Sequence, residues 1–507
     1  MSAKGARLEV VYTLHPTAPA FHVSITCTGE ETVEVRFVDN DSPFVRQNTS
    51  TDTSSSEPNN KRPFILFRNS PGYETDFTLG DKDVPRYSKR LEVPHVQIEG
   101  DDEAAAALNG MIARLVGSYR AGQCWGPFGL TDGKYNGRAF WDLDVWVQPA
   151  MVFLDRETAQ KAAEWRLSCL PQAKKNYDAW VKAGRPVSDK KKLADISGNA
   201  APDLNKVDPG GALFAWESAM DGTELSTAPT RFEHHISGSV ALGLRFAQLS
   251  ELVTEEEAMP VYLAAKTFYW SRSFQHGEGG RRIPMTVSPD EWHVVDNDLY
   301  TNEIANWVHK HGQWADEPYQ SPPRVDGAYL AFDGDEMRGY QQASALLAVW
   351  PLGAITDRTE IGKMYDRFVG KEAPQGPAMT KSLNALIAAR LGRTDEAYKQ
   401  WVDSWKLYTD DPALRFREKQ KVGDGYFLTG AAGCVNAFIY GFLGLSMEPS
   451  VPPNRDADGK LHDSVLHIRT LLPKHWKHVV VDGLWVQGKR IRLEVGPGNK
   501  SVLSEIP

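Results

Sequence analysis

The sequence predicts a mainly helical protein in which paired helices form an α/α toroid, with β segments before and after it. Three observations carry this prediction: helical patterns recur through the middle of the chain, long polar loops separate them, and both ends alternate apolar and polar residues. Helical hairpins with functional loops gathered at one end are typical of a toroid. We therefore expect a β domain over residues 1–100, a helical domain over 101–450 and a second β domain over 451–507.

The first hundred residues have the period of strands. The segments RLEVVYTLH, FHVSITCTG and ETVEVRFVD alternate apolar and polar residues, with Gly and Pro between them. A Ser/Thr-rich stretch, NTSTDTSSSEPNNKRP, follows and is most simply a loop.

From about Asp102 the apolar period becomes helical. DEAAAALNGMIARLVGSYR combines high helix propensity with helical spacing of its apolar residues. Further segments with this period are DRETAQKAAEWRLSCLPQAKKNYDAW, FEHHISGSVALGLRFAQLS, EAMPVYLAAKTFYWSRSF, YQQASALLAVWPLG, AMTKSLNALIAARLG, TDEAYKQWVDSWKLY and TGAAGCVNAFIYGFLGL. After Gly444 strand character returns, and the DG and QG pairs at 482–483 and 487–488 predict tight turns.

The composition is that of a globular chain with an excess of aromatic residues. Its formal net charge of -9 argues against nucleic acid or an anionic membrane as the main partner. The 15 Trp, 17 Tyr and 20 Phe residues would pack a helical core or offer flat faces on which sugars stack, and composition alone favours the core.

The cysteines and the apolar runs exclude other classes. Four separated cysteines predict neither a zinc site nor a disulfide framework. No apolar run approaches the roughly 18 residues of a membrane span. The first residues show no signal-peptide core, so we expect a cytoplasmic location. A homodimer is compatible with the sequence.

Four loops are rich in acids and aromatic residues: Tyr135–Pro149, Phe214–Glu224, Val287–Asn302 and Leu414–Gly433. Each adjoins a helical segment, so we expect all four to meet at one mouth of the toroid. Glycoside cleavage accounts for these residue types. It needs one protonated carboxyl for the leaving oxygen and a second carboxyl that activates water or acts as nucleophile.

Glu291 is the first candidate for the acid. A carboxyl acid needs a raised pKa, which a partly desolvated aromatic shell provides, and Glu291 is followed directly by Trp292. Taken alone, the loop is better explained by an exposed glutamate.

Five motifs in order resemble glycoside hydrolase family 65: FWDLDVWVQP, AWESAMDGTE, SPDEWH with DNDLYTN, QQASALLAVWP and FLTGAAG. The resemblance covers roughly Leu108–Leu445. It implies an (α/α)6 barrel with flanking β domains, of which the N-terminal one is a shortened β-sandwich here. It also implies inverting phosphorylase or hydrolase activity on α-glucosides, without a cofactor.

The resemblance implies a role for each matching residue. Glu291 takes the place of the general acid. Asp142 should bind glucose hydroxyls, while Trp141 forms a wall of the pocket. Gln342 is what remains of a Lys-Gln pair, whose lysine is replaced by Gln341. The expected substrate-binding residues are Phe140, Trp141, Asp142, Trp216, Glu217, Trp292, His293 and Gln342.

Three histidines have two interpretations each. His293 either hydrogen-bonds a sugar or orients the acid loop, and His234 and His235 either cap a helix or form a wall of the site. A metal site from His293 with Asp296 and Asp298 matches no standard zinc or calcium spacing, so no metal is expected.

The choice between hydrolase and phosphorylase depends on two loops. QGPAMTKSLNAL has neither a His nor a Ser pair and resembles the hydrolases of the family. The resemblance places the base that activates water at Glu418, before Phe427-Leu428-Thr429-Gly430, although Arg417 departs from the family's pattern. Glu372 and Asp424 are the alternative bases.

We therefore predict an inverting exo-α-glucosidase that releases β-glucose, with α-1,2-linked substrates as the first choice. A phosphorylase of the same family and a non-catalytic sugar-binding protein stay open. Inversion predicts that Glu291 and Glu418 face each other at roughly 6.5–9.5 Å.

Overall fold

The computed structural model describes residues 7–14, 21–28, 74–79, 93–119, 122, 125–129, 135–187, 208–227, 229–275, 280–312, 319–410, 415–420, 422, 425–456 and 459–506. The chain divides into two compact units, Met1–Glu92 and Val93–Pro507. The three-domain division at residues 100 and 450 stays a prediction.

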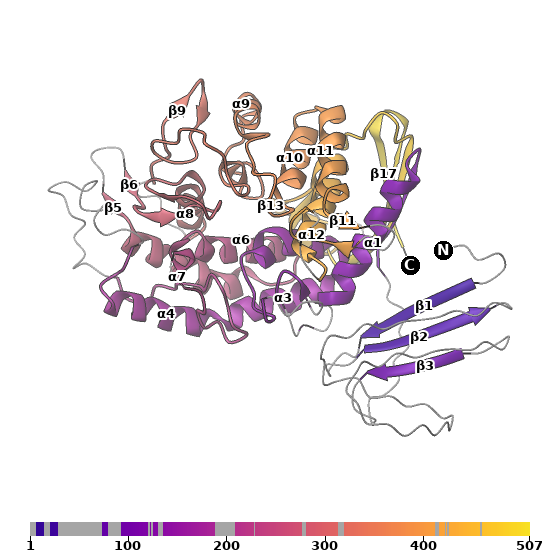
Figure 1. The fold of residues 1–507 in the computed structure, drawn as a ribbon, viewed down its shortest axis with the longest axis horizontal. Helices are drawn as coiled ribbons and strands as arrows, with labels where there is room; N and C mark the ends of the chain where they lie inside the picture. The colour runs from indigo at the N-terminus through magenta and orange to yellow at the C-terminus, as the bar shows by residue number, and fades with distance from the viewer. Residues whose placement is uncertain are drawn as a thin grey trace. The chain divides into compact units, whose positions relative to one another are not determined.

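The first unit contains an antiparallel sheet in the order β1-β2-β3 (Figure 1). Its strands are β1 (Arg7–Leu14), β2 (Phe21–Thr28) and β3 (Glu74–Leu79). β1 and β2 coincide with the first two predicted strands. The predicted strand ETVEVRFVD and the Ser/Thr-rich stretch lie outside the described residues.

The second unit is mainly helical, which confirms the predicted mainly helical class (Figure 1). Its α-helices are α1 (Asp102–Tyr119), α2 (Gln148–Leu154), α3 (Arg156–Ser168), α4 (Leu170–Lys182), α6 (Ile236–Leu249), α7 (Glu255–Arg272), α8 (Leu299–His311), α9 (Arg358–Phe368), α10 (Thr380–Arg390), α11 (Thr394–Lys406) and α12 (Leu428–Asn436). Two π-helical segments, Leu143–Val147 before α2 and Ala437–Phe442 after α12, extend these helices.

Several helices begin where the sequence supplies a cap. Thr254 and Glu257 form a reciprocal capping box at the start of α7. The Asp298 carboxylate accepts a hydrogen bond from the backbone N–H of Thr301 at the start of α8. This cap sets where the loop that carries Glu291 ends.

The segment YQQASALLAVWPLG is not the predicted helix. Only Ala345–Ala348 forms a 3-10 turn. Upstream of it, Tyr340 pairs with Glu372 in an isolated β-bridge, and downstream Pro351 has no N–H with which to continue a helix. The segment is therefore a loop that can aim its glutamines at the pocket described below.

The C-terminal strands form two antiparallel arrangements. β13 (Leu445–Arg455) pairs with β14 (Leu461–Ile468). The other sheet has the order β17-β16-β15-β4 and contains β15 (His478–Val486), β16 (Lys489–Gly496), β17 (Lys500–Glu505) and β4 (His95–Glu99). β4 therefore pairs with a strand nearly at the other end of the chain.

The two predicted tight turns have different outcomes. Gln487 and Gly488 have φ of 49° and 83° and join β15 to β16 as predicted. Asp482-Gly483 does not turn the chain: the pair lies inside β15, where the register shifts between Asp482 and Leu484. Gly483 has φ of 90°, so this glycine makes a bulge in the strand.

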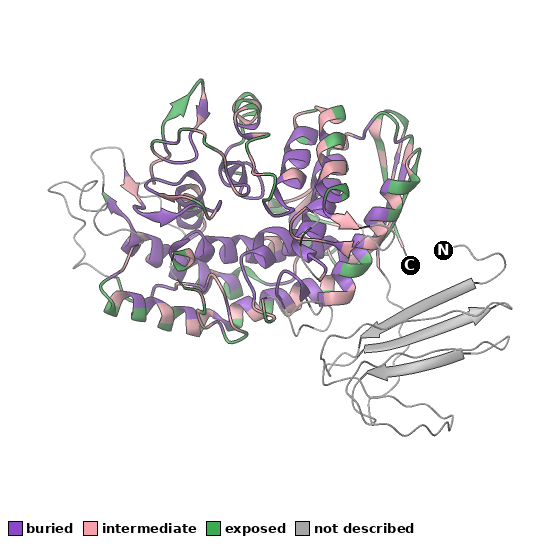
Figure 2. Ribbon diagram, viewed as in Figure 1, coloured by how far each residue is buried: buried purple, intermediate pink, exposed green. Residues whose placement is uncertain are grey.

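The core lies where α6 packs against its neighbours, and most residues of α6 are buried (Figure 2). A Cβ at Gly243 would stand 3.0 Å from the Cα of Asp144, so this glycine lets α6 approach the first π-helical segment closely. Trp125, Trp141, Trp146 and Trp401 are fully buried, which agrees with core packing for much of the aromatic excess. Among the described residues, no helix is both long enough and apolar enough to span a bilayer.

Candidate active site

One pocket of the second unit gathers residues from all four of the acid- and aromatic-rich loops. The centre of a water molecule can move through about 80 Å³ of it. The residues that line it are Pro127, Tyr135, Phe140, Trp141, Asp142, Trp216, Glu291, Gln341, Gln342, Pro377, Met379, Glu418 and Phe427. Loops far apart in the chain thus meet at one place.

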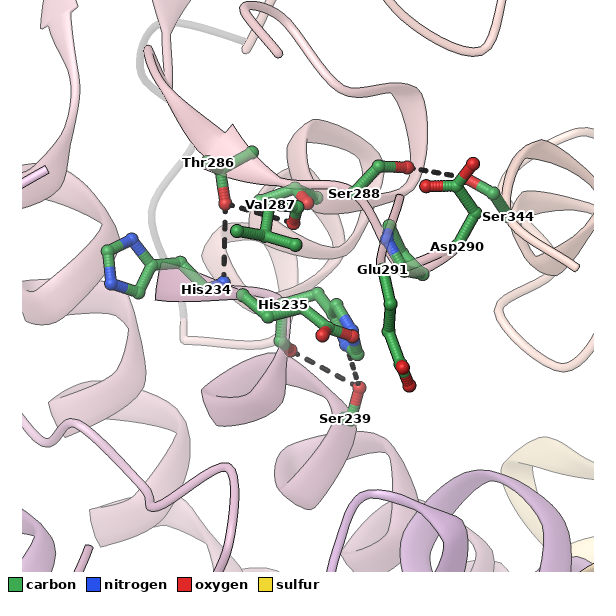
Figure 3. A network of polar contacts seen from close by, with 12 residues as sticks. His234, His235, Ser239, Thr286, Val287, Ser288, Asp290, Glu291 and Ser344 are labelled. Atoms are coloured by element: carbon green, nitrogen blue, oxygen red, sulfur yellow. Dashed lines mark hydrogen bonds and ion pairs between the residues drawn. The ribbon is translucent and has the colours of Figure 1, made fainter. Parts of the chain in front are cut away.

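Glu291 lies at the tip of a short hairpin between β7 (Thr286–Val287) and β8 (Val294–Val295). Its φ of 62° lies in the left-handed region, where the backbone of a residue other than Gly is strained. The side chains of Asp290 and Glu291 leave the loop in opposite directions (Figure 3). The turn therefore directs Glu291 alone into the pocket.

Asp290 holds this turn in place. The carboxylate is fully buried and accepts hydrogen bonds from the backbone N–H groups of Trp292 and His293, both at 3.2 Å. Its other oxygen lies 2.5 Å from Nδ1 of His293, and this hydrogen bond raises the pKa of the imidazole. This contact favours the second of the two expected roles of His293, orientation of the loop, and His293 is not among the residues that line the pocket.

Two amide groups hold the carboxylate of Glu291. Nε2 of Gln341 donates to Oε2 at 3.1 Å, and Nε2 of Gln342 donates to Oε1 at 3.0 Å. Each oxygen keeps one further lone pair, and either can carry the acidic proton. Burial, together with the like charge of Asp142, raises the pKa of Glu291 to about 7.

Replacing Glu291 with Gln should change how stability depends on pH. The pKa of Glu291 is about 7 in the folded state, above its ordinary value of 4.5, so the folded state binds this proton more tightly than the unfolded state. The free energy of unfolding of the wild type should therefore fall by on the order of 1–3 kcal/mol as pH rises from the ordinary pKa to the folded-state pKa. The variant should not show this fall. Urea unfolding of both proteins from about pH 4 to about pH 8 measures the difference. Parallel stability curves would contradict the burial of this carboxyl.

Asp142 is the second buried acid of the pocket. It precedes the first π-helical segment and accepts a hydrogen bond from Oγ1 of Thr429 at 2.7 Å. Burial raises its pKa to about 6, and nearby carboxylates add to the rise. An acceptor-rich carboxylate between aromatic walls suits the hydroxyl groups of a sugar.

Glu418 reaches the same pocket from the loop before α12. The phenolic O–H of Tyr135 donates to its carboxylate at 3.1 Å. Its backbone carbonyl accepts from the N–H of Ala378 at 2.9 Å, which ties this loop to the QGPAMT segment. The structure thus brings Glu291 and Glu418 to one pocket, and their predicted separation stays a prediction.

The other candidates for the base are placed differently. Glu372 forms an ion pair of 3.0 Å with Lys381 and lines a separate cavity. Asp424 lies outside the described residues. Arg417, which departs from the expected pattern, forms an ion pair of 2.6 Å with Asp410. Of the described candidates, Glu418 alone lines the pocket with Glu291.

Two further predicted binding residues lie outside the lining of the pocket. Glu217 forms an ion pair of 2.6 Å with Arg138, and Trp292 is 49% exposed. Trp216 does line the pocket and meets Phe140 edge-on at 5.1 Å.

The motifs in the sequence did not reveal several residues of the site. Tyr135, Gln341 and Thr429 each donate a hydrogen bond to a pocket carboxylate. Tyr135 begins one of the four loops rich in acids and aromatic residues, and Thr429 lies in the FLTGAAG motif, but neither position indicates a contact with a carboxylate. Gln341 stands where the resemblance implies a lysine, yet its amide donates directly to Glu291.

Behind Trp141, the buried His235 joins two residues that the motifs did not reveal, Glu233 and Ser239. Nε2 of His235 lies 2.6 Å from Oε1 of Glu233, and its Nδ1 lies 3.0 Å from Oγ of Ser239 (Figure 3 labels His235 and Ser239). The Ser239 hydroxyl donates to the His235 carbonyl, so Nδ1 must carry a proton. Burial lowers the pKa of His235 to about 3 and raises the pKa of Glu233, which favours the neutral form of both groups.

This group supports one wall of the pocket. The ring of His235 meets Trp141 edge-on at 4.9 Å, and His235 makes no side-chain cap on α6. Of the two expected roles for His235, the structure therefore favours the wall over the cap.

Residues 118–184, which include Phe140, Trp141 and Asp142, match the sequence profile of the glycosyl hydrolase family 65 central catalytic domain. This segment belongs to glycosyl hydrolase family 65. The resemblance predicted from the five motifs is thereby confirmed.

Curated relatives are similar over a longer part of the chain. A kojibiose hydrolase from Mucilaginibacter mallensis is 27% identical over 419 residues, which cover 78% of this chain and 56% of the relative. One from Flavobacterium johnsoniae is 29% identical over 424 residues, with the same coverage. A protein-glucosylgalactosylhydroxylysine glucosidase from Dictyostelium discoideum is 25% identical over 409 residues, covering 74% and 54%. The chain thus spans little more than half the length of these relatives.

A solved structure shares the fold. It is described as a kojibiose phosphorylase from the human microbiome, and the TM-score is 0.62 at 12% identity, over 100% of this chain and 76% of that one. At this identity the likeness concerns the fold alone.

Proposed function

We propose that this protein is an inverting, exo-acting α-glucoside hydrolase built on an (α/α)6 barrel. The observation that carries the proposal is one pocket in which a buried glutamate with a raised pKa and a second, tyrosine-bonded glutamate meet among aromatic walls. The membership of residues 118–184 in family 65 supports the same reaction class.

In this proposal each residue has a separate role in the reaction. Asp142 accepts hydrogen bonds from the glucose hydroxyls, and Trp141 and Phe140 cover the apolar faces of the ring. Glu291 gives its proton to the leaving oxygen. Glu418 takes a proton from the water that attacks the anomeric carbon from the opposite face, so the product is β-glucose.

The substrate class follows from the relatives. Two of them are named kojibiose hydrolases, at 27% and 29% identity, so α-1,2-linked glucose is the first candidate.

The test is a panel of glucose disaccharides incubated with and without phosphate, with the product anomer followed by NMR. We expect phosphate-independent release of β-glucose, fastest from an α-1,2 linkage. Release of β-glucose 1-phosphate only when phosphate is present would identify a phosphorylase instead. Initial release of α-glucose would contradict inversion, and no release from any glycoside would favour a sugar-binding protein.

Replacing Gln341 with Lys should move the basic limb of the kcat/KM profile to lower pH. The acid works only when protonated, so activity falls as pH rises through its pKa, about 7 in the free enzyme. An ammonium group beside the carboxyl favours its charged form and should lower this pKa by roughly one to three units.

Gln341→Met is the matched control for that variant. It removes a hydrogen bond that lowers the pKa of Glu291 without adding charge, so the limb should move slightly upward. The two variants should shift the profile in opposite directions. Shifts in the same direction would show that the limb belongs to another group.

A further inference from the structure

A second, smaller cavity shares Gln342 with the pocket that contains Glu291. The centre of a water molecule can move through about 20 Å³ of it, and Gln342, Ser344, Glu372, Thr380 and Asn384 are among its lining residues. One water needs roughly 10–15 Å³ by this measure, so the cavity admits water and no sugar.

Gln342 has a defined orientation between the two cavities. Its Nε2 donates to the carbonyl of Pro289 at 2.8 Å as well as to Glu291 at 3.0 Å. Both partners accept, so the atom that faces them is the nitrogen and the oxygen must face the other way. That oxygen is buried and has no partner within the described part of the chain.

Three more buried polar atoms around the cavity also lack a hydrogen-bond partner among the described residues. Both amide atoms of Asn384, which is 1% exposed on α10, lack a partner among the described residues. So does Oε2 of Glu372, whose Oε1 accepts from Lys381 at 3.0 Å. A buried polar atom without a hydrogen bond is costly, so four around one cavity indicate a polar occupant.

The hydrogen-bonding types of these four atoms indicate which occupant fits the cavity. Three of them accept and one donates, so the occupant must both donate and accept, as water does. An anion is excluded by the carboxylate and amide oxygens. The ammonium group of Lys381, already paired with Glu372, disfavours a cation.

We propose that this cavity is a binding site for ordered water and that Asn384 is a positioning residue for the acid. Water held by Asn384 and Glu372 donates to Oε1 of Gln342 and thereby aims Nε2 of Gln342 at Glu291. Two nearby hydrogen bonds, between Ser288 and Ser344 (Figure 3) and between Thr380 and the N–H of Ala343, join the surrounding segments. The kinetic consequence rests on the function proposed above, whereas the site itself does not.

The first test is a high-resolution crystal structure of the full chain. Ordered density at about 2.7–3.2 Å from Gln342 and Asn384 is the expected result. A dry cavity would overturn the proposal, as would shorter contacts, near about 2.4 Å, that mark a cation.

The second test is kinetic and uses Asn384→Leu, which fills the site with apolar atoms. On a disaccharide, kcat should fall about tenfold or more with KM little changed, because a misaimed Gln342 weakens proton donation. On an aryl α-glucoside with an activated leaving group, which needs no proton, the loss should be much smaller. Asn384→Ala leaves room for a further water and should be milder.

Asn436→Leu is the matched control, since Asn436 is also a fully buried asparagine but lines neither cavity. It should not change the ratio of activities on the two substrates. Equal losses on both substrates in Asn384→Leu, or no loss on either, would overturn the positioning role. If the wild type cleaves no α-glucoside, the proposed function fails while the crystal structure still decides the water site.

Discussion

Replacing Glu291 with Gln should reduce kcat on glucose disaccharides by about 10²–10⁴-fold, the usual contribution of a general acid. The structure supports this size of effect because the carboxyl is buried, is held by two amide groups and has a pKa of about 7. Near neutral pH a large fraction of the protein is therefore protonated at this position. Steady-state kinetics on a disaccharide measure the loss.

The leaving group provides the control for this variant. An aryl α-glucoside with a good leaving group needs little protonation, so Glu291→Gln should retain most of its activity on such a substrate. The basic limb of the wild-type pH profile should also disappear. If both substrates lose activity equally, Glu291 binds or positions the substrate and another group is the acid.

Replacing Glu418 with Ala should abolish hydrolysis of every α-glucoside, because water is then left without a base. We expect a loss of about 10²–10⁴-fold or more that a good leaving group does not relieve. A small anionic nucleophile needs no base and fits the space of the missing carboxyl. Azide should therefore restore turnover and yield β-glucosyl azide, detectable by NMR.

Asp424→Asn and Glu336→Gln are the comparison variants for Glu418→Ala. Asp424 is the rival base from the sequence. Glu336 is a glutamate whose side chain is 65% exposed in its ion pair with Arg338, so its substitution should leave activity unchanged. Azide rescue of Asp424→Asn in place of Glu418→Ala would move the role of base to Asp424. Formation of α-glucosyl azide would exclude inversion.

The sequence predicted the parts of the site that lie within single loops. Glu291 was singled out by its motif, and Phe140, Trp141 and Asp142 by theirs, and all four line the pocket. Such motifs can be recognised because their residues are neighbours in the chain. Helical periods likewise located helices such as α1, α10 and α11, since each is a regular local pattern.

The sequence pattern predicted the wrong structure where a local preference competed with long-range contacts. Residues 340–353 have a helical period, but their glutamines are turned toward Glu291 and their ends are fixed by Glu372 and Pro351. Asp482-Gly483 has the composition of a turn, but β16 on one side and β4 on the other keep it in a strand. In both cases tertiary pairing outweighed the local preference.

By itself the sequence predicted the family, the helical class and Glu291 as the candidate acid, because each prediction depends on residues close together in the chain. Only the tertiary structure decided what holds each acid. Tyr135 and Glu418 lie 283 residues apart, Asp142 and Thr429 lie 287 apart, and Gln342 lies 51 residues from Glu291. Hydrogen bonds over such separations leave no period or motif, yet they hold the carboxyl groups in the pocket.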